Sequence, residues 1–269
     1  MYRFTGLGRP IDLRYPSNRF IVAVAIISSA VAYVAADAEA LVAAITVGGS
    51  AFFGWAIARE IDPDRTRSAA IAGPASAALG WWAYSQATAV SLGALYLVLV
   101  AVRVVIRTTG TPPTRFDLGL HLVIVAWLSA GSHAWLAALV MAVAVVRDTR
   151  LPDPAPAVNL KWGAAIGTVA ALVAGVGSAQ SEWSVPDATG AALLVSGVVG
   201  TAILVRPQSV TSLSDVGHRQ LDPLRLAMAR LTAGSGAVLV AVVGGAAGLW
   251  AVAPAFVAIA ATAAVRLAR

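Results

Sequence analysis

The sequence predicts an all-α protein, a polytopic transmembrane bundle of about nine to ten helical spans, and composition gives the first reason. Of the 269 residues, 59% are hydrophobic and only 12% are charged, whereas soluble domains average about 45–50% apolar and about 25% charged residues. The apolar runs are continuous rather than alternating, which favours helices over strands. This composition excludes a soluble enzyme, a disordered tail, a nucleic-acid-binding arm and a fibrous repeat.

Ten stretches are apolar enough to be considered as spans, which need about 17–25 mostly apolar residues. No long polar segment interrupts them, so we expect one integral membrane domain over 1–269, with 1–19 as a cytoplasmic segment and 20–267 as the transmembrane bundle. The fifth and sixth stretches are short. The predicted stretches are Phe20–Ala36, Ala40–Ala58, Ala69–Tyr84, Ala89–Ile106, Leu118–Ala130, Trp135–Val146, Trp162–Ala179, Ala188–Val205, Leu226–Gly244 and Ala247–Leu267.

The distribution of basic residues predicts the orientation. With the amino terminus inside, all 19 Lys and Arg fall in the inner segments, as the positive-inside rule requires. The outer segments hold only Asp37, Glu39, Glu182 and Asp187. We therefore expect a multi-pass protein of the cell (inner or plasma) membrane with a cytoplasmic amino terminus. Its net charge of +6 then reflects orientation and contact with anionic membrane lipids, and not nucleic-acid binding.

Two predicted inner loops concentrate charges of both signs. Carboxylates can hold Mg²⁺ through their oxygens, and guanidinium groups can bind phosphate in a forked geometry. The alternative is a pair of solvated turns, since Asp-Pro-Asp is ordinary turn chemistry. The charged residues are Arg59, Glu60, Asp62, Asp64, Arg65 and Arg67 in the first loop, and Arg147, Asp148, Arg150 and Asp153 in the second.

The first loop resembles a known acidic signature. Arg59-Glu60-Ile61-Asp62, followed by Arg65-Thr66-Arg67, is similar to the first motif of the UbiA family of intramembrane prenyltransferases, at the cytosolic end of helix two. The family's second motif lies between helices six and seven, where Asp148 and Asp153 fall, and Arg9-Pro10 matches an Arg-Pro pair common before its first helix.

The resemblance implies Mg²⁺-dependent transfer of a prenyl group from a polyprenyl diphosphate to a lipid or aromatic acceptor. It implies catalytic roles for Asp62, Asp64, Asp148 and Asp153, and metal binding by these four residues and Glu60. It implies phosphate contacts from Arg59, Arg65, Arg67, Arg147 and Arg150.

The sequence departs from the family pattern at several positions. Aligning Asp62 with the last acidic residue of the first motif places Gly54, Trp55 and Ala58 where the family has Asn, Asp and Asp. The two aspartates of the second motif are one residue further apart than in the family, and a tenth span is present. The resemblance therefore implies a diverged member, either catalytically degenerate or with a site rebuilt from Glu60, Asp62 and Asp64.

Two other functions fit the predicted topology. Ten spans divide near Gly131 into two halves of five, the layout of inverted-repeat transporters of the drug/metabolite carrier type. A non-catalytic membrane subunit that only packs against partners would need no chemistry at all. Among single residues, His121 is an ionisable group inside a predicted span, which is a functional candidate unless it only bonds to a neighbouring helix.

Overall fold

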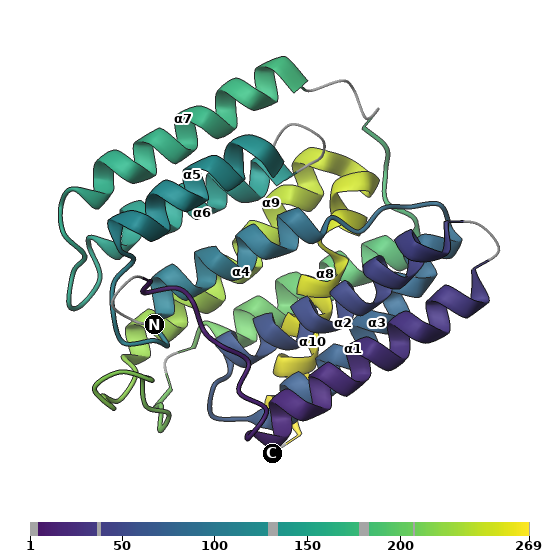
Figure 1. The fold of residues 1–269 in the computed structure, drawn as a ribbon, viewed down its shortest axis with the longest axis horizontal. Helices are drawn as coiled ribbons and strands as arrows, with labels where there is room; N and C mark the ends of the chain where they lie inside the picture. The colour runs from purple at the N-terminus through teal and green to yellow at the C-terminus, as the bar shows by residue number, and fades with distance from the viewer. Residues whose placement is uncertain (1–4, 37–38, 129–133, 178–182, 207, 269) are drawn as a thin grey trace.

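The computed structural model describes residues 5–36, 39–128, 134–177, 183–206 and 208–268. Over these residues the chain is a bundle of ten α-helices (Figure 1), and the extended pairing is limited to one bridge, Leu213 with Gln220. The predicted all-α class is confirmed. The helices are α1 Pro16–Ala35, α2 Ala40–Ile61, α3 Thr66–Ser85, α4 Leu92–Ile106, α5 Arg115–Leu128, α6 Ala134–Asp148, α7 Asn159–Gly177, α8 Ala188–Leu204, α9 Pro223–Ala251 and α10 Ala253–Leu267.

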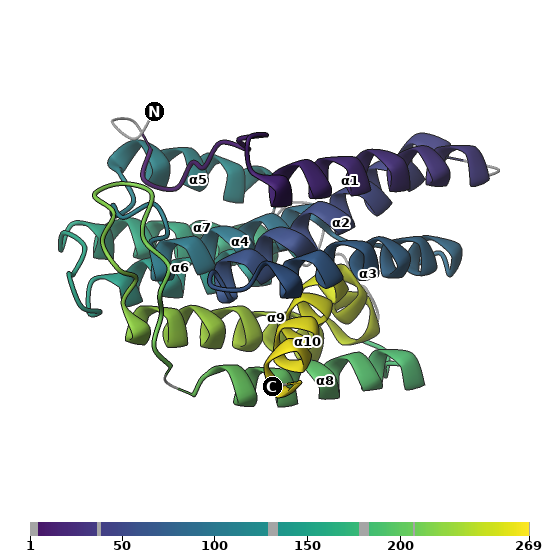
Figure 2. The same ribbon diagram turned by 90° about the horizontal axis from the view of Figure 1, so that it is seen from below.

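Helix α4 lies at the centre of the bundle. Its sequence is apolar on all sides, which is typical of a helix that is buried all round, and it packs against α2, α6 and α9. Helices α1–α3 lie on one side of it and α5–α7 on the other (Figure 1). Figure 2 shows α8, α9 and α10 as a layer beneath, with α1 and α5 on the opposite face.

Among the described helices, α1, α2 and α9 are long and apolar enough to cross a membrane.

The carboxyl-terminal helices correct one predicted boundary. The helical conformation is interrupted at the predicted end of the ninth stretch. The interruption is at Gly245, which has a φ of 59° and lies inside the residue range of α9. Beyond it the chain folds back, since a Cβ added at Gly248 would lie 2.2 Å from the carbonyl oxygen of Val240. The predicted single stretch Ala247–Leu267 is wrong: it breaks again at Val252, and α10 begins with Pro254 in its first turn, a position that suits proline.

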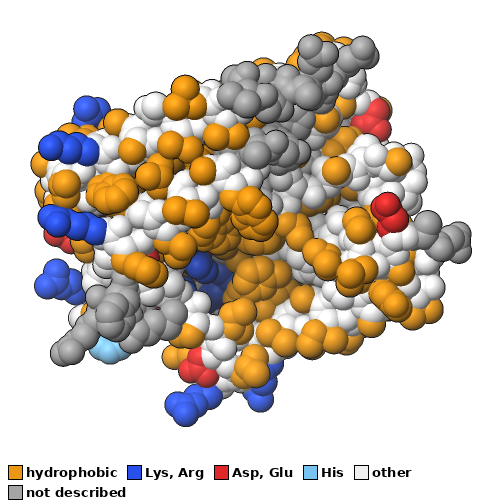
Figure 3. Space-filling view, turned by 45° about the horizontal axis from the view of Figure 1, so that its top comes forward, with side chains coloured by type: hydrophobic (Ala, Val, Ile, Leu, Met, Phe, Trp, Pro, Cys, Tyr) orange, Lys and Arg blue, Asp and Glu red, His pale blue; other side chains and the backbone are white. Residues whose placement is uncertain are grey.

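Charged contacts gather at one end of the bundle. The ion pairs found among the described residues all join segments that the sequence analysis placed on the inner side, including the ends of α2, α4, α6 and α10 and the start of α9. Figure 3 shows Lys and Arg side chains along the left and lower edge of the molecule, while hydrophobic side chains cover much of the rest. The predicted inner segments therefore do come together in space.

Candidate functional site

Glu60, in the last turn of α2, is bound by the end of α4. Its side chain lies in the interior, with the residue only 1% exposed. Arg103 Nε donates a hydrogen bond to Glu60 Oε1 over 2.8 Å, and the Thr108 hydroxyl donates to Oε2 over 2.8 Å. Both carboxylate oxygens therefore have partners, and neither partner is a metal ligand.

Asp62 lies on the other side of the same helix end. It is 2% exposed, and its carboxylate oxygens lie 3.9 Å from Arg65 Nη1 and 3.7 Å from Arg266 Nη2. Burial raises the pKa of Asp62, while the charges of Arg266 and Arg65 act in the opposite direction. Glu60 and Asp62 differ by two positions, about 200° around a helix. The two acidic groups of the first motif thus face different neighbours.

Asp64 holds a distant loop in place. Its carboxylate accepts hydrogen bonds from the backbone N–H groups of Thr211 and Ser212, over 3.0 and 2.7 Å, and one from the Ser212 hydroxyl. Burial acts to raise the pKa of Asp64, but these hydrogen bonds outweigh it and lower the pKa below its usual range. This carboxylate fixes the loop before α9 against the α2–α3 turn.

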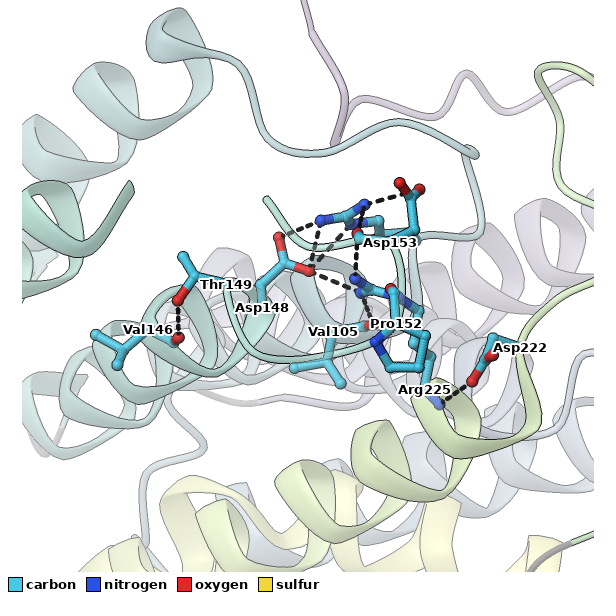
Figure 4. A network of polar contacts seen from close by, with 9 residues as sticks. Val105, Val146, Asp148, Thr149, Pro152, Asp153, Asp222 and Arg225 are labelled. Carbon is cyan, nitrogen blue, oxygen red and sulfur yellow. Dashed lines mark hydrogen bonds and ion pairs between the residues drawn. The ribbon is translucent and has the colours of Figure 1, made fainter. Parts of the chain in front are cut away.

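Asp148, at the end of α6, lies between two arginines (Figure 4). It is fully buried, and Arg107 donates to both of its oxygens, from Nε and Nη2, over 3.0 Å each. Arg225 Nη1 donates to Oδ1 over 2.7 Å. Asp153 lies at the edge of this network: its side chain is 79% exposed, and Oδ2 is 3.3 Å from Arg107 Nη1. The network joins α4, α6 and α9 at their inner ends.

These carboxylates do not fit a magnesium centre. Mg²⁺ takes several oxygen ligands in a tight octahedral arrangement, but no group of three or more His, Cys, Asp or Glu that could hold a metal occurs in the part of the chain that the structure describes. At the position of the family's Asn, Gly54 packs against α3, and a Cβ added there would lie 2.0 Å from Ser76 Oγ. This face of α2 therefore serves helix packing.

The arginines predicted to contact phosphate are dispersed. Arg59 is partly buried, and its Nη1 donates to the carbonyl oxygen of Pro63 over 3.2 Å. Arg67 and Arg150 are exposed, Arg147 is partly exposed, and Arg65 lies beside Asp62. Of the arginines that pair with the buried carboxylates, the sequence analysis gave a site role only to Arg65; it gave none to Arg103, Arg107, Arg225 and Arg266.

Helix α4 also presents one accessible stripe. Its only residues that are not buried are Leu92, Gly93, Tyr96 and Arg103. Tyr96 and Arg103 are seven residues apart and so share a face, and from Leu92 to Arg103 the stripe runs for about 16 Å. Figure 3 shows a hollow between α1 and α5, above α4, with hydrophobic walls and Lys or Arg side chains at one end. Along the stripe, as in the hollow, the apolar residues lie at one end and the cationic Arg103 lies at the other.

His121 is bonded to this stripe. The Tyr96 hydroxyl and His121 Nε2 are 2.9 Å apart, and the two rings are stacked with centroids 5.8 Å apart. His121 Nδ1 lies 2.6 Å from the carbonyl oxygen of Asp117. Because a carbonyl oxygen can only accept, Nδ1 carries the proton, and Nε2 of the neutral ring accepts from Tyr96. The pair links α4 to α5, which is the alternative that the sequence left open for His121.

Comparisons with known proteins add no relative. The chain matches no protein-family model, and neither the curated proteins nor the solved structures contain a significant match to it.

Proposed function

We propose that the chain is an integral membrane protein whose inner end faces the cytoplasm. The support is the contrast between its surfaces. Helix α1 is exposed along most of its length, with Ile26, Ile27 and Val31 each more than 60% exposed, and α8 exposes Val195 and Val199. Large contiguous apolar surfaces are rare on soluble monomers but suit contact with lipid. The charged contacts lie at the end where the positive-inside rule puts the cytoplasm.

We propose that the protein binds an amphipathic anionic lipid of the polyprenyl diphosphate class in the hollow above α4. The observation that carries this proposal is the stripe Leu92, Gly93, Tyr96 and Arg103, the one accessible line on an otherwise buried central helix. An apolar chain fits the apolar part of the stripe, and a guanidinium suits a diphosphate at its end. The proposal agrees in ligand class with the UbiA resemblance.

The proposal does not include a magnesium-organised transfer step. In UbiA-like chemistry the metal would supply neutralisation of the diphosphate leaving group. Here Arg103 and Thr108 donate to the two oxygens of Glu60, two arginines donate to those of Asp148, and the other acidic residues face elsewhere. The residues of this chain would therefore bind the diphosphate through arginine alone, and the chain would act as a diverged, lipid-binding relative of the family.

The test is binding of labelled geranylgeranyl diphosphate to the protein in nanodiscs, with and without Mg²⁺. We expect saturable binding that does not require Mg²⁺ and that weakens about tenfold or more when Arg103 is removed, since a hydrogen bond to a charged group commonly contributes this much. Arg103→Gln alone would leave Glu60 buried without its cation. The variant to use is therefore the double Glu60→Gln/Arg103→Gln, in which both charges are removed together.

The exposed Arg150 provides the control, and Arg150→Gln should bind as the wild type does. Binding that depends on Mg²⁺ and is lost in Asp62→Asn/Asp64→Asn would restore the magnesium site that the resemblance implies. Absence of binding in the wild type would reject the proposal and favour the transporter or the non-catalytic subunit.

A further inference from the structure

A second basic cluster lies on the opposite side of the α2 end from Glu60 and the hollow. Arg65 from the α2–α3 turn and Arg266 from the last turn of α10 approach the Asp62 carboxylate, at 3.9 and 3.7 Å. Arg230 of α9 is the third cation, and it interacts electrostatically with Asp62 and with Arg266. Three guanidinium groups therefore surround one carboxylate. The three arginines and Asp62 carry about two positive units of net charge in a region where Arg230 and Asp62 are only 3% and 2% exposed. Asp64, which also interacts electrostatically with Arg230 and Arg266, lowers this excess to about one.

The hydrogen bonds of this cluster are incomplete. Nε and Nη1 of Arg266 and Nη1 of Arg65 are buried without a hydrogen-bond partner, as is Oδ2 of Asp62. The Arg266 side chain is only 5% exposed, so bulk water does not complete its bonds. A buried guanidinium N–H without a partner is destabilising, and more so than a neutral group. The contrast with Asp148, whose two arginines bond directly to its oxygens, shows that other buried arginines of this chain do have partners.

Ordinary helix capping accounts for only one of the three arginines. Arg230 donates from Nε to the carbonyl oxygen of Ile61 over 2.8 Å and from Nη1 to that of Leu204 over 3.1 Å. These carbonyls end α2 and α8, where a cation is favoured by the helix dipoles. Arg230 is thus fixed by two helix ends. Arg266 and Arg65 have no such partners for the nitrogens named above, so these N–H donors are unused in the described structure.

We propose that Arg65, Arg230 and Arg266 form a binding site for a phosphate group with at most one ester bond, supplied either by inorganic phosphate or by the headgroup of a lipid such as phosphatidic acid. A phosphate anion offsets the excess positive charge of this cluster. Its oxygens can accept from several N–H donors at once, as guanidinium groups prefer. The site is most open beside Arg65, whose side chain is 20% exposed, and this is the side from which the anion would enter.

Two carboxylates bear on this site. Asp62 borders it, and because burial raises the pKa of Asp62, its carboxyl group can take up a proton beside a bound phosphate more readily than an exposed aspartate would. Asp64 is exposed and is held by the backbone of Thr211 and Ser212. The site does not include the hollow above α4, so its test is independent of the test of the function proposed above.

The experiment measures thermal unfolding of the full chain in a neutral detergent during titration with two probes. One is inorganic phosphate, compared with chloride at equal ionic strength, and the other is dioctanoyl phosphatidic acid, compared with dioctanoyl phosphatidylglycerol. A ligand that binds only the folded state raises the unfolding midpoint in a saturable manner. We expect saturation with inorganic phosphate, with phosphatidic acid, or with both. The probe that saturates at the lower concentration identifies the source of the phosphate.

The variants test the assignment to these arginines. Arg266→Gln should weaken binding about tenfold or more, because it removes charged hydrogen bonds, while geranylgeranyl diphosphate binding should not change. The control is Arg206→Gln, at an exposed arginine just beyond α8, and it should bind as the wild type does. Should Arg266→Gln fail to fold, Arg65→Gln, at the most exposed member, replaces it. No saturable effect in the wild type, or equal affinity in the folded variant, would overturn the proposal.

Discussion

Replacing Asp148 by asparagine should strongly destabilise the protein, because this carboxylate neutralises two buried arginines. It is 0% exposed and accepts three hydrogen bonds, two from Arg107 and one from Arg225. Asparagine keeps the shape but loses the charge, and its amide N–H₂ would point at guanidinium donors. Removing one partner of a buried ion pair costs about 3–5 kcal/mol. Solvent screening does not reduce this value, because no part of the side chain is exposed.

The remaining contacts of the two arginines limit the loss. Arg107 keeps the carbonyl oxygen of Asp153, and Arg225 keeps those of Val105, Pro152 and Asp153. Neither guanidinium therefore becomes wholly unbonded, and what is lost is mainly the negative charge. We expect a loss near the lower end of the range, about 3 kcal/mol in the free energy of unfolding.

The assay is unfolding in mixed micelles by a titration with sodium dodecyl sulfate, followed by tryptophan fluorescence. The matched control is Asp153→Asn, in the same loop, which removes one 3.3 Å contact from a side chain that is 79% exposed. It should change stability by less than about 1 kcal/mol, as exposed ion pairs do. A loss below 1 kcal/mol for Asp148→Asn, or one no larger than that of the control, would refute the assignment of Asp148 to the structural network.

Four further predictions follow from other parts of the structure. Gly245→Ala should lower the unfolding midpoint in the same titration by the equivalent of about 1–3 kcal/mol, because Gly245 has φ 59° and ψ −147° and an added Cβ would lie 2.7 Å from the Ser184 carbonyl oxygen. Tyr96→Phe should cost about 1 kcal/mol by that measurement, since it removes the hydrogen bond to His121; an unchanged midpoint would contradict the bond. The folded-state pKa of Asp64 is lowered, so its contribution to stability is present above the unfolded value of about 3.9 and is lost as the pH falls through the lower folded value. Thermal unfolding between pH 3 and 6 should show this loss in the wild type and less of it in Asp64→Asn. Reporter fusions placed at four predicted outer positions should all report the side opposite to the cytoplasm; the positions are Asp37, Ser85, Ser132 and Glu182. Two or more cytoplasmic results would overturn the span count.

The sequence was sufficient for local features, because these depend on neighbouring residues. Apolar runs placed the first eight helices within a few residues, as for the predicted Ala188–Val205 against α8 at Ala188–Leu204. The predicted end of the ninth stretch, Gly244, lies next to the break that the structure has at Gly245. Gly131, near which the ten predicted spans divide into two halves, lies outside the described residues.

The pairing of the charged residues could not be predicted in the same way. Arg107 and Asp148 are 41 positions apart, and their contact depends on how α4 and α6 pack. One signal was present in the sequence. The stretch that became α4 is almost entirely apolar, so its position is central, and arginines at its end are expected to meet partners from neighbouring helices. The positive-inside rule accounts for Arg103 and Arg107 as orientation signals and so gave no reason to look for partners.

The same pairing decides where an anion can bind at the inner end. A guanidinium that already bonds to a buried carboxylate has few N–H groups left, and displacing the carboxylate would leave that charge buried and unpaired. Arg107 and Arg225 are in this position, so a phosphate would not compete for them. Arg103 is only partly buried and gives Nε to Glu60, which leaves its outer nitrogens for the hollow. Arg266 has buried nitrogens without any hydrogen-bond partner, which is why the proposed anion site includes it. The family resemblance identifies the acidic residues as the candidate site. The unused hydrogen-bond donors instead identify Arg103 and Arg266 as candidate anion-binding residues. Binding measurements on these two arginines separate the hollow from the cluster.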